Sequence, residues 1–187
     1  MIPLHTIDKS WTLFLDRDGV INHEKDNGYI HTWDEFIFYE GVLEGFRIFK
    51  QHFKRIIIVT NQRGVGKGIT LPENLELIHQ HLREAVIKAG GLIDAIYFCT
   101  AIDNNHPDRK PNPGMGLQAK HQFPDICFEK SIMVGNTFSD MQFGRNLGMY
   151  TVFLPTTKKD VNPADERIDE TYDSLISFAL ALPADKL

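Results

Sequence analysis

Two carboxylates stand at the end of a short apolar segment near the N-terminus, in the run Asp16-Arg17-Asp18-Gly19. The preceding residues 11–15 are apolar apart from one threonine, a pattern typical of a strand buried at the centre of a parallel sheet. Both acids then lie where the strand leaves the sheet, at the edge where open α/β folds bind ligands. Carboxylates this close raise each other's pKa unless a cation or a reaction stabilises their charge. A simple strand-ending turn is the alternative interpretation.

Three further groups of polar residues stand where a predicted strand ends or a predicted helix begins. They are Thr60-Asn61-Gln62 after a second apolar segment, Arg109-Lys110 before a helix marked by Pro113, and Gly135-Asn136-Thr137-Phe138-Ser139-Asp140 after a fourth segment. A helix N-terminus favours anions, so the two cations before Pro113 are well placed to meet one. Together the groups offer acids for a hard cation and donors for an anion. A phosphoryl group bound with magnesium matches this combination.

The elements that must position these residues alternate between strand and helix. Strands are predicted at 11–15, 55–60, 95–99, 131–134 and 150–154, and helices at 41–52, 72–89, 114–122, 139–147 and 172–180. This alternation predicts a Rossmann-like, three-layer α/β/α domain with a central parallel sheet covered on both faces. We expect strand 11–15 at its centre, with Asp16 and Asn136 as neighbours where the strand order reverses. The glycine-rich residues 64–68 and the polar residues 156–171 are predicted to be loops.

Composition narrows the class of protein. A chain of 187 residues predicts one domain with a sizeable core. The net charge of −5, without a basic stripe, argues against a nucleic-acid partner. Two cysteines are too few for a disulfide scaffold and favour a reducing cytoplasm. Asp8 and Lys9 near the start, without a long apolar stretch, predict no signal peptide, and nothing approaches the roughly 18 apolar residues of a membrane span, so no membrane partner is expected. We expect a cytoplasmic monomer.

The four polar groups resemble the four motifs of the haloacid dehalogenase (HAD) superfamily of phosphohydrolases. These motifs, in order over nearly the whole chain, are residues 16–20, Thr60-Asn61, Lys110-Pro111 and residues 135–140. Segments 23–38, 60–64 and 109–115 are similar to the group of D,D-heptose 1,7-bisphosphate and histidinol-phosphate phosphatases. The resemblance implies one HAD-like domain over residues 1–187 with a minimal cap. That cap is a flap at about residues 20–40, too short for a helical cap domain.

The resemblance also implies a role for each motif residue. Asp16 is the expected nucleophile, which forms an aspartyl-phosphate that water hydrolyses, and Asp18 is the expected acid and base. The residues expected to bind the phosphoryl group and the rest of the substrate are Thr60, Asn61, Gln62, Arg109 and Lys110. Magnesium would be bound by Asp16, by the main chain of Asp18 and by a side chain of the fourth motif, Asn136 or Asp140.

Two departures from the family pattern bear on metals. The fourth motif usually begins Gly-Asp, whereas this chain has Gly135-Asn136. An amide oxygen can bind magnesium but brings no charge, so the affinity should fall unless Asp140 supplies the missing carboxylate. Many members of the group also carry a zinc loop of three cysteines and a histidine before Arg109. Here residues 99–109 contain one cysteine and one histidine, so no structural zinc is expected.

The function predicted from the sequence is a magnesium-dependent phosphomonoesterase of carbohydrate metabolism. The expected substrate is a small phosphorylated metabolite, first of all D-glycero-D-manno-heptose 1,7-bisphosphate. Histidinol phosphate is the alternative substrate, because the two activities share these motifs. A catalytically weak, phosphate-binding relative is a second alternative, motivated by Asn136.

Two features outside the motifs lead to further expectations. His79 and His81 are two apart on a helix and are predicted to be surface residues. The aromatic side chains of residues 29–39 have two interpretations. They form either a flap that closes over substrate or a hydrophobic patch that anchors a long loop.

Overall fold

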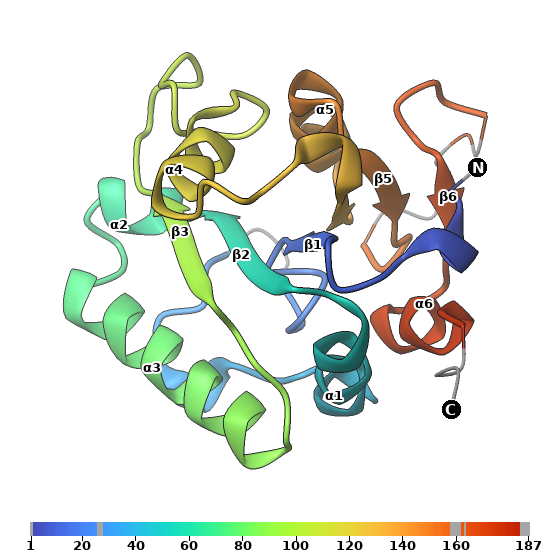
Figure 1. The fold of residues 1–187 in the computed structure, drawn as a ribbon. Coiled ribbons are helices and arrows are strands. Elements are labelled where there is room, and N and C mark those ends of the chain that lie inside the picture. The colour runs from blue at the N-terminus through green and yellow to red at the C-terminus, as the bar shows by residue number, and fades with distance from the viewer. Residues whose placement is uncertain (1, 26–27, 158–161, 163, 184–187) are drawn as a thin grey trace.

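The computed structural model describes residues 2–25, 28–157, 162 and 164–183. Its centre is a sheet of six parallel strands, shown in Figure 1. From one edge to the other they are β3 (Ala95–Cys99), β2 (Arg55–Asn61), β1 (Thr12–Leu15), β4 (Ser131–Gly135), β5 (Tyr150–Phe153) and β6 (Glu170–Thr171). Strand β1, predicted to be central, lies inside the sheet, between β2 and β4. The Rossmann-like α/β fold is confirmed.

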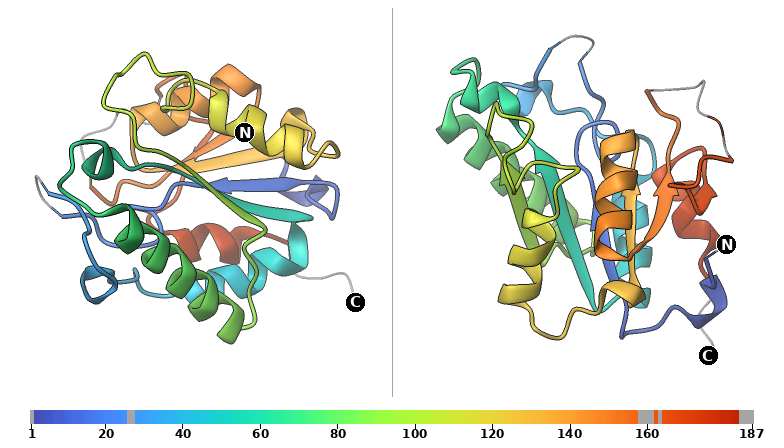
Figure 2. Two further views of the ribbon diagram at one scale, coloured as in Figure 1. Left: turned by 90° about the vertical axis from the view of Figure 1, so that its left-hand side faces the viewer. Right: turned by 90° about the horizontal axis from the view of Figure 1, so that it is seen from above.

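Helices cover both faces of the sheet, as the alternating pattern predicts. On one face lie α1 (Val42–His52), α3 (Pro72–Lys88) and α6 (Leu175–Ala181), and on the other α4 (Gly114–Gln122) and α5 (Phe138–Leu147), as Figures 1 and 2 show. Single turns of helix occur at η1 (Leu4–Thr6), η2 (Trp33–Glu35), α2 (Arg63–Gly66) and η3 (Phe128–Lys130). Within the described residues, no helix has the length and apolar character needed to cross a membrane.

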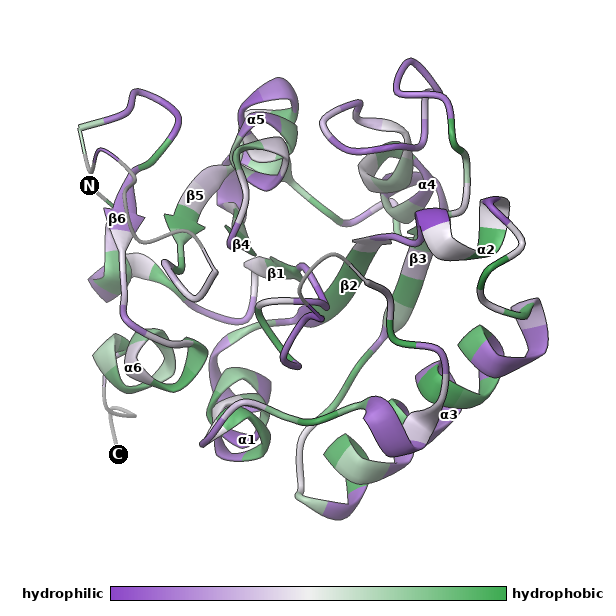
Figure 3. Ribbon diagram, turned by 180° about the vertical axis from the view of Figure 1, so that it is seen from behind, coloured by the Kyte–Doolittle hydropathy of each residue, from purple (hydrophilic) through white to green (hydrophobic). Residues whose placement is uncertain are grey.

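The side chains of β1 alternate between two hydrophobic cores. Leu13 and Leu15 belong to the core under α1, α3 and α6, whereas Phe14 belongs to the core under α4 and α5. Successive side chains of a strand point to opposite faces, so a strand covered on both faces must be apolar throughout. In Figure 3 the central strands are accordingly hydrophobic, while the outer helices alternate hydrophobic and hydrophilic residues.

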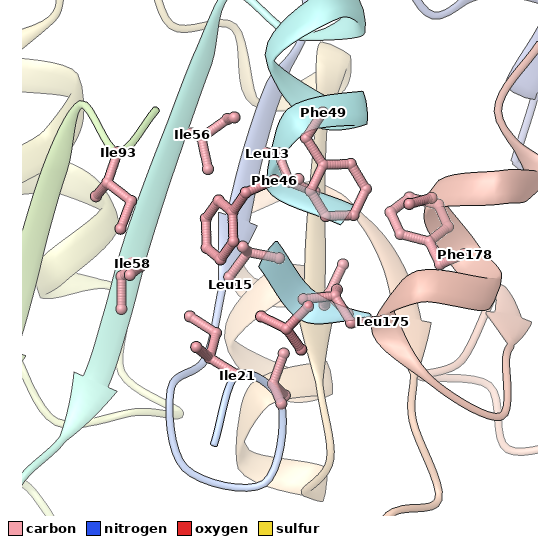
Figure 4. Packing of buried hydrophobic residues seen from close by; sticks show 14 of the residues in the cluster. Leu13, Leu15, Ile21, Phe46, Phe49, Ile56, Ile58, Ile93, Leu175 and Phe178 are labelled. Carbon is pink, nitrogen blue, oxygen red and sulfur yellow. The ribbon is translucent and has the colours of Figure 1, made fainter. Parts of the chain in front are cut away.

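Aromatic rings fill the larger core. Figure 4 shows Phe46 and Phe49 of α1 over β1, with Phe178 of α6 beside Phe49. The ring centroids of Phe49 and Phe178 lie 5.6 Å apart, and both side chains are fully buried. This contact fixes α6 against α1 and holds the C-terminal part of the chain on the sheet.

The strand register brings the polar groups to one edge. Leu15 of β1 pairs with Ile58 of β2 and with Val134 of β4, and the Asp16 amide donates to the Val134 carbonyl at 3.0 Å. The residues that follow these strands therefore leave the sheet side by side, at the carboxyl edge.

Three predictions about secondary structure are wrong. Residues 156–171, predicted to be a loop, end in β6, although 158–161 and 163 lie outside the described residues. The glycine-rich residues 64–68 overlap α2, and the last helix begins at Leu175 rather than 172. Strand β6 and helix α2 are too short to show a hydrophobic period, and Ser174, whose hydroxyl accepts from the Ser177 amide, caps the last helix.

The segment expected to form a flap packs against the body of the protein. Trp33 stacks on Phe36, with ring centroids 5.0 Å apart, and on His81 of α3, at 5.3 Å. Phe36 is buried, and an antiparallel bridge joins Asn22 to Phe38. Trp33, Phe36 and Phe38 thus anchor this segment, in line with the second of the two interpretations. Residues 26–27 of the segment lie outside the described residues.

The contact between α1 and α6 leads to a prediction about stability. Replacing Phe49 with alanine removes a fully buried ring, so the free energy of unfolding in denaturant should fall by about 3–5 kcal/mol. Leu180→Ala on α6 is the control, because Leu180 is 69% exposed and its loss should change stability by less than about 0.5 kcal/mol. A similar loss in both variants would show that the α1–α6 contact is not a main support of the fold.

Candidate active site

The polar residues at the carboxyl edge surround two adjoining cavities. The smaller, of about 170 Å³, is lined by Asp16, Asp18, Glu24, Thr60, Asn61, Lys110, Thr137, Ser139 and Asp140. The larger, of about 410 Å³, is lined by Asp18, Glu24, Lys25, Gly28, Tyr29, Ile30, Asn61 and Gln62. The smaller cavity contains most of the predicted site residues, and the larger adds Gln62. Arg109 and Asn136 line neither cavity.

Lys110 joins the acids of two motifs. Its ammonium lies 2.9 Å from an oxygen of Asp16 and 2.6 Å from an oxygen of Asp140, and it donates to the Val59 carbonyl at 2.8 Å. Burial lowers the pKa of Lys110, but the charges of Asp140 and Asp16 outweigh burial and hold the pKa above its usual value. Lys110 is therefore a buried, charged ammonium in contact with three oxygens.

Asp16 is a buried carboxyl at the end of β1. Burial, and after it the charge of Asp140, raise its pKa to about 7, although Lys110 opposes the shift. One of its oxygens also accepts from the Arg17 amide at 2.7 Å. The carboxyl is thus held in one orientation, and its charge is only partly compensated by the protein.

Asp18 is turned toward donors. Its oxygens accept from the Arg17 guanidinium at 2.8 Å, from Asn22 at 2.8 Å and from Gln62 at 2.8 Å. Burial raises the pKa of Asp18, but Arg17 and these hydrogen bonds outweigh burial, so the pKa lies below its usual value. The second acid of the motif is therefore an ionised carboxylate, in contrast to Asp16.

Asn61 and Gln62 position other site residues. The Asn61 amide donates to the Lys110 carbonyl at 3.1 Å and accepts from the Lys110 amide at 3.0 Å, which locks the third motif against the second. Gln62 donates to Asp18 and, at 2.9 Å, to the buried hydroxyl of Thr60. The side chains of Asn61 and Gln62 are thus already engaged within the protein.

The fourth motif supplies one engaged acid and one free amide oxygen. Asp140 faces Lys110 with one oxygen and accepts from the Thr137 amide and hydroxyl with the other, at 3.0 and 2.7 Å, which caps α5. A Cβ on Gly135 would lie 2.2 Å from that of Asp140, so only glycine fits there. Asn136 is fully buried, and its Oδ1 has no hydrogen-bond partner in the described part of the chain.

These donors fit a hard cation, although not as a cluster of acids. Among the described residues, no three His, Cys, Asp or Glu side chains converge as metal ligands. Asp18 turns to Arg17 and Asp140 caps α5, which leaves the Asp16 carboxylate and the free oxygen of Asn136. Two buried acids also share one ammonium, so the site keeps an uncompensated negative charge that magnesium would neutralise.

Sequence reasoning missed a buried network behind Asp18. Arg17 is fully buried, and its guanidinium contacts Nε2 of His79 at 3.2 Å. Burial and the charge of Arg17 lower the pKa of His79 to about 3, so the imidazole is neutral and Nε2 accepts from the guanidinium. The prediction of His79 as a surface residue is wrong, because α3 turns this residue toward the end of β1. In the sequence, this network is indicated by the position of Arg17 between the carboxylates of Asp16 and Asp18.

Arg109 lies beside other cations at the outer part of the site. It donates weakly to the Ala101 carbonyl at 3.4 Å, and burial and the neighbouring Arg63 guanidinium lower its pKa. Nε of Arg63 is buried without a hydrogen-bond partner in the described part of the chain. The ring of Tyr29, which lines the larger cavity, lies 5.6 Å from the ammonium of Lys67.

The sequence matches known phosphatases over most of its length. A family model described as polynucleotide kinase 3 phosphatase matches residues 12–178. A D-glycero-alpha-D-manno-heptose-1,7-bisphosphate 7-phosphatase of Mycobacterium bovis is 32% identical over 173 residues, which cover 92% of this chain and 91% of the relative. A D-glycero-beta-D-manno-heptose-1,7-bisphosphate 7-phosphatase of Helicobacter pylori is 40% identical over 138 residues, covering 72% and 77%.

The fold matches solved structures of the same kind. The crystal structure of the D,D-heptose 1,7-bisphosphate phosphatase from B. bronchiseptica, complexed with magnesium and phosphate, superposes with a TM-score of 0.80 at 26% identity. The match covers 91% of this chain and 96% of that one. The four motifs meet at one sheet edge, and the relatives match over most of the chain. The chain therefore belongs to the HAD superfamily and is a phosphatase of the group that contains the heptose bisphosphate phosphatases.

Proposed function

We propose that this phosphatase hydrolyses D-glycero-D-manno-heptose 1,7-bisphosphate through an aspartyl-phosphate, with Asp16 as the nucleophile. The observation that carries this proposal is the carboxyl of Asp16, held by Lys110 and facing a small cavity that adjoins a larger one. The small cavity offers space for the phosphoryl group and the larger one for the sugar.

In the first step an oxygen of Asp16 attacks phosphorus in line with the leaving oxygen. Lys110 keeps the carboxyl oriented and favours its ionised form, which is the nucleophilic one. The attack forms the bond between Asp16 and phosphorus and breaks the bond to the sugar oxygen. The hydroxyl of Thr60 and the ammonium of Lys110 are the donors that face the phosphoryl oxygens, where the negative charge is concentrated.

Asp18 handles the protons of both steps. As an ionised carboxylate held by Arg17 and Gln62, it is ready to remove a proton from the water that hydrolyses the phosphoryl-aspartate. An arriving phosphoryl group adds negative charge beside Asp18 and so raises its pKa, which favours the protonated form needed for the leaving oxygen. Asn61 and Gln62 act on the substrate indirectly, by fixing Lys110 and Asp18.

Magnesium would be held by the carboxylate of Asp16, the main chain of Asp18 and Oδ1 of Asn136. When bound it supplies positive charge to the phosphoryl oxygens. Asp140 supports this arrangement through Lys110, because both of its oxygens are engaged by Lys110 and Thr137.

Two arginines are candidates for binding the second phosphate of a bisphosphate substrate. Arg63 follows Gln62, which lines the larger cavity, and its charge repels that of Arg109. Neither arginine forms an ion pair in the described part of the chain. Guanidinium groups that no carboxylate neutralises are a favourable environment for a phosphate. This pair supports a bisphosphate over histidinol phosphate, which has one phosphate.

We further propose that residues 1–187 act as one domain, a monomer of the cytoplasm, with a minimal cap at about residues 20–40. The open larger cavity suits a substrate whose far end extends outward. The names of the relatives include both the alpha and the beta anomer.

Steady-state kinetics with a panel of phosphate esters tests this function. The panel contains both anomers of the heptose bisphosphate, a heptose monophosphate and histidinol phosphate, each assayed with and without magnesium. The highest kcat/KM is expected for a heptose bisphosphate, with loss of activity after chelation. A preference for histidinol phosphate would contradict the proposed substrate, and the absence of any hydrolysis would favour the weak phosphate-binding relative.

Asp16→Asn should abolish turnover without unfolding the protein. An amide is a poor nucleophile toward phosphorus, so kcat should fall by about a thousandfold or more. The variant removes one of two buried acids that share Lys110, so the free energy of unfolding should stay within about 1 kcal/mol of wild type or rise. Phosphate release and denaturant unfolding are the measurements. Substantial activity in the purified variant would rule out the covalent mechanism.

Arg63→Met tests the site for the second phosphate. The loss of a charge-assisted hydrogen bond of about 2 kcal/mol should raise KM for the bisphosphate about tenfold or more. KM for para-nitrophenyl phosphate, a monoester, should change less than about twofold, because its single phosphate occupies the smaller cavity. Arg47→Met is the control, since Arg47 is half exposed on α1 and paired with Glu44. Equal effects on both substrates would place Arg63 outside a second phosphate site.

A further inference from the structure

The carboxylate that the fourth motif lacks has a substitute nearby. Asn136 is fully buried, and its Oδ1 is unpartnered in the described part of the chain. A buried oxygen without a donor is costly unless a ligand meets it. Because Asn136 is neutral, the charge that an aspartate would bring to a bound cation must come from another residue.

Glu24 is the acid in the right place. It lies in the loop that follows β1 and lines the smaller cavity together with Asp16 and Asp18. Burial, and after it the charges of Asp18 and Asp140, raise the pKa of Glu24, whereas hydrogen bonding with the Thr157 hydroxyl and the Asn136 amide opposes the shift. No ion pair neutralises Glu24 within the described residues, and the adjacent Lys25 pairs with Glu35 instead, at 2.5 Å.

The hydrogen bonds between these residues fix the orientation of the Asn136 amide. Nδ2 of Asn136 donates to the Thr157 hydroxyl at 2.8 Å, so the hydroxyl proton is free to be donated to Glu24. An ionised carboxylate only accepts, so its presence selects the orientation in which the nitrogen of Asn136 faces this side. Oδ1 is then the atom left without a partner, which is the atom a hard cation needs.

Gly19 makes the arrangement possible from the other side. A Cβ on Gly19 would lie 2.0 Å from Nδ2 of Asn136, so the main chain after Asp18 approaches the amide closely. Asn136 is thus packed between Gly19 and Thr157, next to Glu24.

We infer that Glu24 replaces the carboxylate missing from the fourth motif, by adding negative charge to the magnesium site and by orienting Asn136 through Thr157. The inference rests on the proposed magnesium-dependent function but concerns a residue outside the four motifs. Glu24 is a positioning residue here: it acts on the cation through Asn136 and through its charge, and it takes no part in the transfer of the phosphoryl group.

Manganese binding measured without substrate tests the inference. The dissociation constant of Mn²⁺, followed by electron paramagnetic resonance at low ionic strength, is compared among wild type, Glu24→Gln, Asn136→Asp and the double variant. Glu24→Gln should weaken binding about tenfold or more, since residues that orient a metal ligand typically contribute that much. Asn136→Asp in the Glu24→Gln background should restore binding to within about threefold of wild type, because the charge returns at the usual position.

Asp34→Asn is the matched control. Asp34 lies in the same segment, in η2, and is exposed, so its loss should leave Mn²⁺ binding unchanged. Thermal unfolding of each variant separates a loss of metal binding from a loss of fold.

The outcomes distinguish this inference from the proposed function. Unchanged Mn²⁺ binding in Glu24→Gln, or a double variant as weak as Glu24→Gln, would overturn the role of Glu24 while leaving the phosphatase mechanism intact. Wild type that binds Mn²⁺ through Glu24 but hydrolyses no heptose bisphosphate would support the inference and contradict the proposed substrate. Wild type that binds no Mn²⁺ would overturn the inference.

Discussion

The site depends on one buried ammonium. Lys110 lies between Asp16 at the end of β1 and Asp140 at the start of α5, and its ammonium donates to the Val59 carbonyl of β2. Two acids this deeply buried could not both remain ionised without it, since each charge costs several kcal/mol to desolvate. The same side chain therefore ties three elements together and keeps the nucleophile in place. Its own main chain is held in turn by Asn61.

The two acids of the first motif differ because their surroundings differ. Asp16 meets one shared cation and a second acid, and its pKa is raised to about 7 by burial and by Asp140. Asp18 meets a guanidinium of its own and two amides, and its pKa is lowered despite burial. Pairs of acids whose pKa values are moved apart in this way are typical of sites in which one carboxyl attacks and the other moves protons. The buried His79 behind Arg17 helps to make that difference, as a neutral acceptor that leaves the charge of the guanidinium to Asp18.

The sequence was sufficient for the parts of the structure that depend on long patterns. The apolar run of β1, covered on both faces, and the order of the motifs predicted the sheet and the edge at which Asp16 and Lys110 meet. It was insufficient where a feature depends on a few tertiary contacts. Strand β6 has two residues and pairs with the edge of β5. His79 is buried because α3 turns it toward Arg17 and toward Phe98 of β3. The engagement of Asn61 and Gln62 within the protein likewise follows from side-chain orientations that no spacing reveals.

Asn136 illustrates how a motif can change without losing its chemistry. Four acids, Asp16, Asp18, Asp140 and Glu24, line the smaller cavity. The cations that pair with them are Lys110 and Arg17, so the protein already has more negative than positive charge there. An aspartate at position 136 would add a fifth carboxylate, buried next to Glu24 and repelled by it. With a neutral amide at the buried position 136 and an acid at the exposed position 24, the cation still meets an oxygen and a negative charge. The cost of desolvation is smaller than for a buried aspartate at position 136. Charge at a metal site is a property of the whole cavity, and the position at which a chain supplies it can move from the sheet edge to a neighbouring loop.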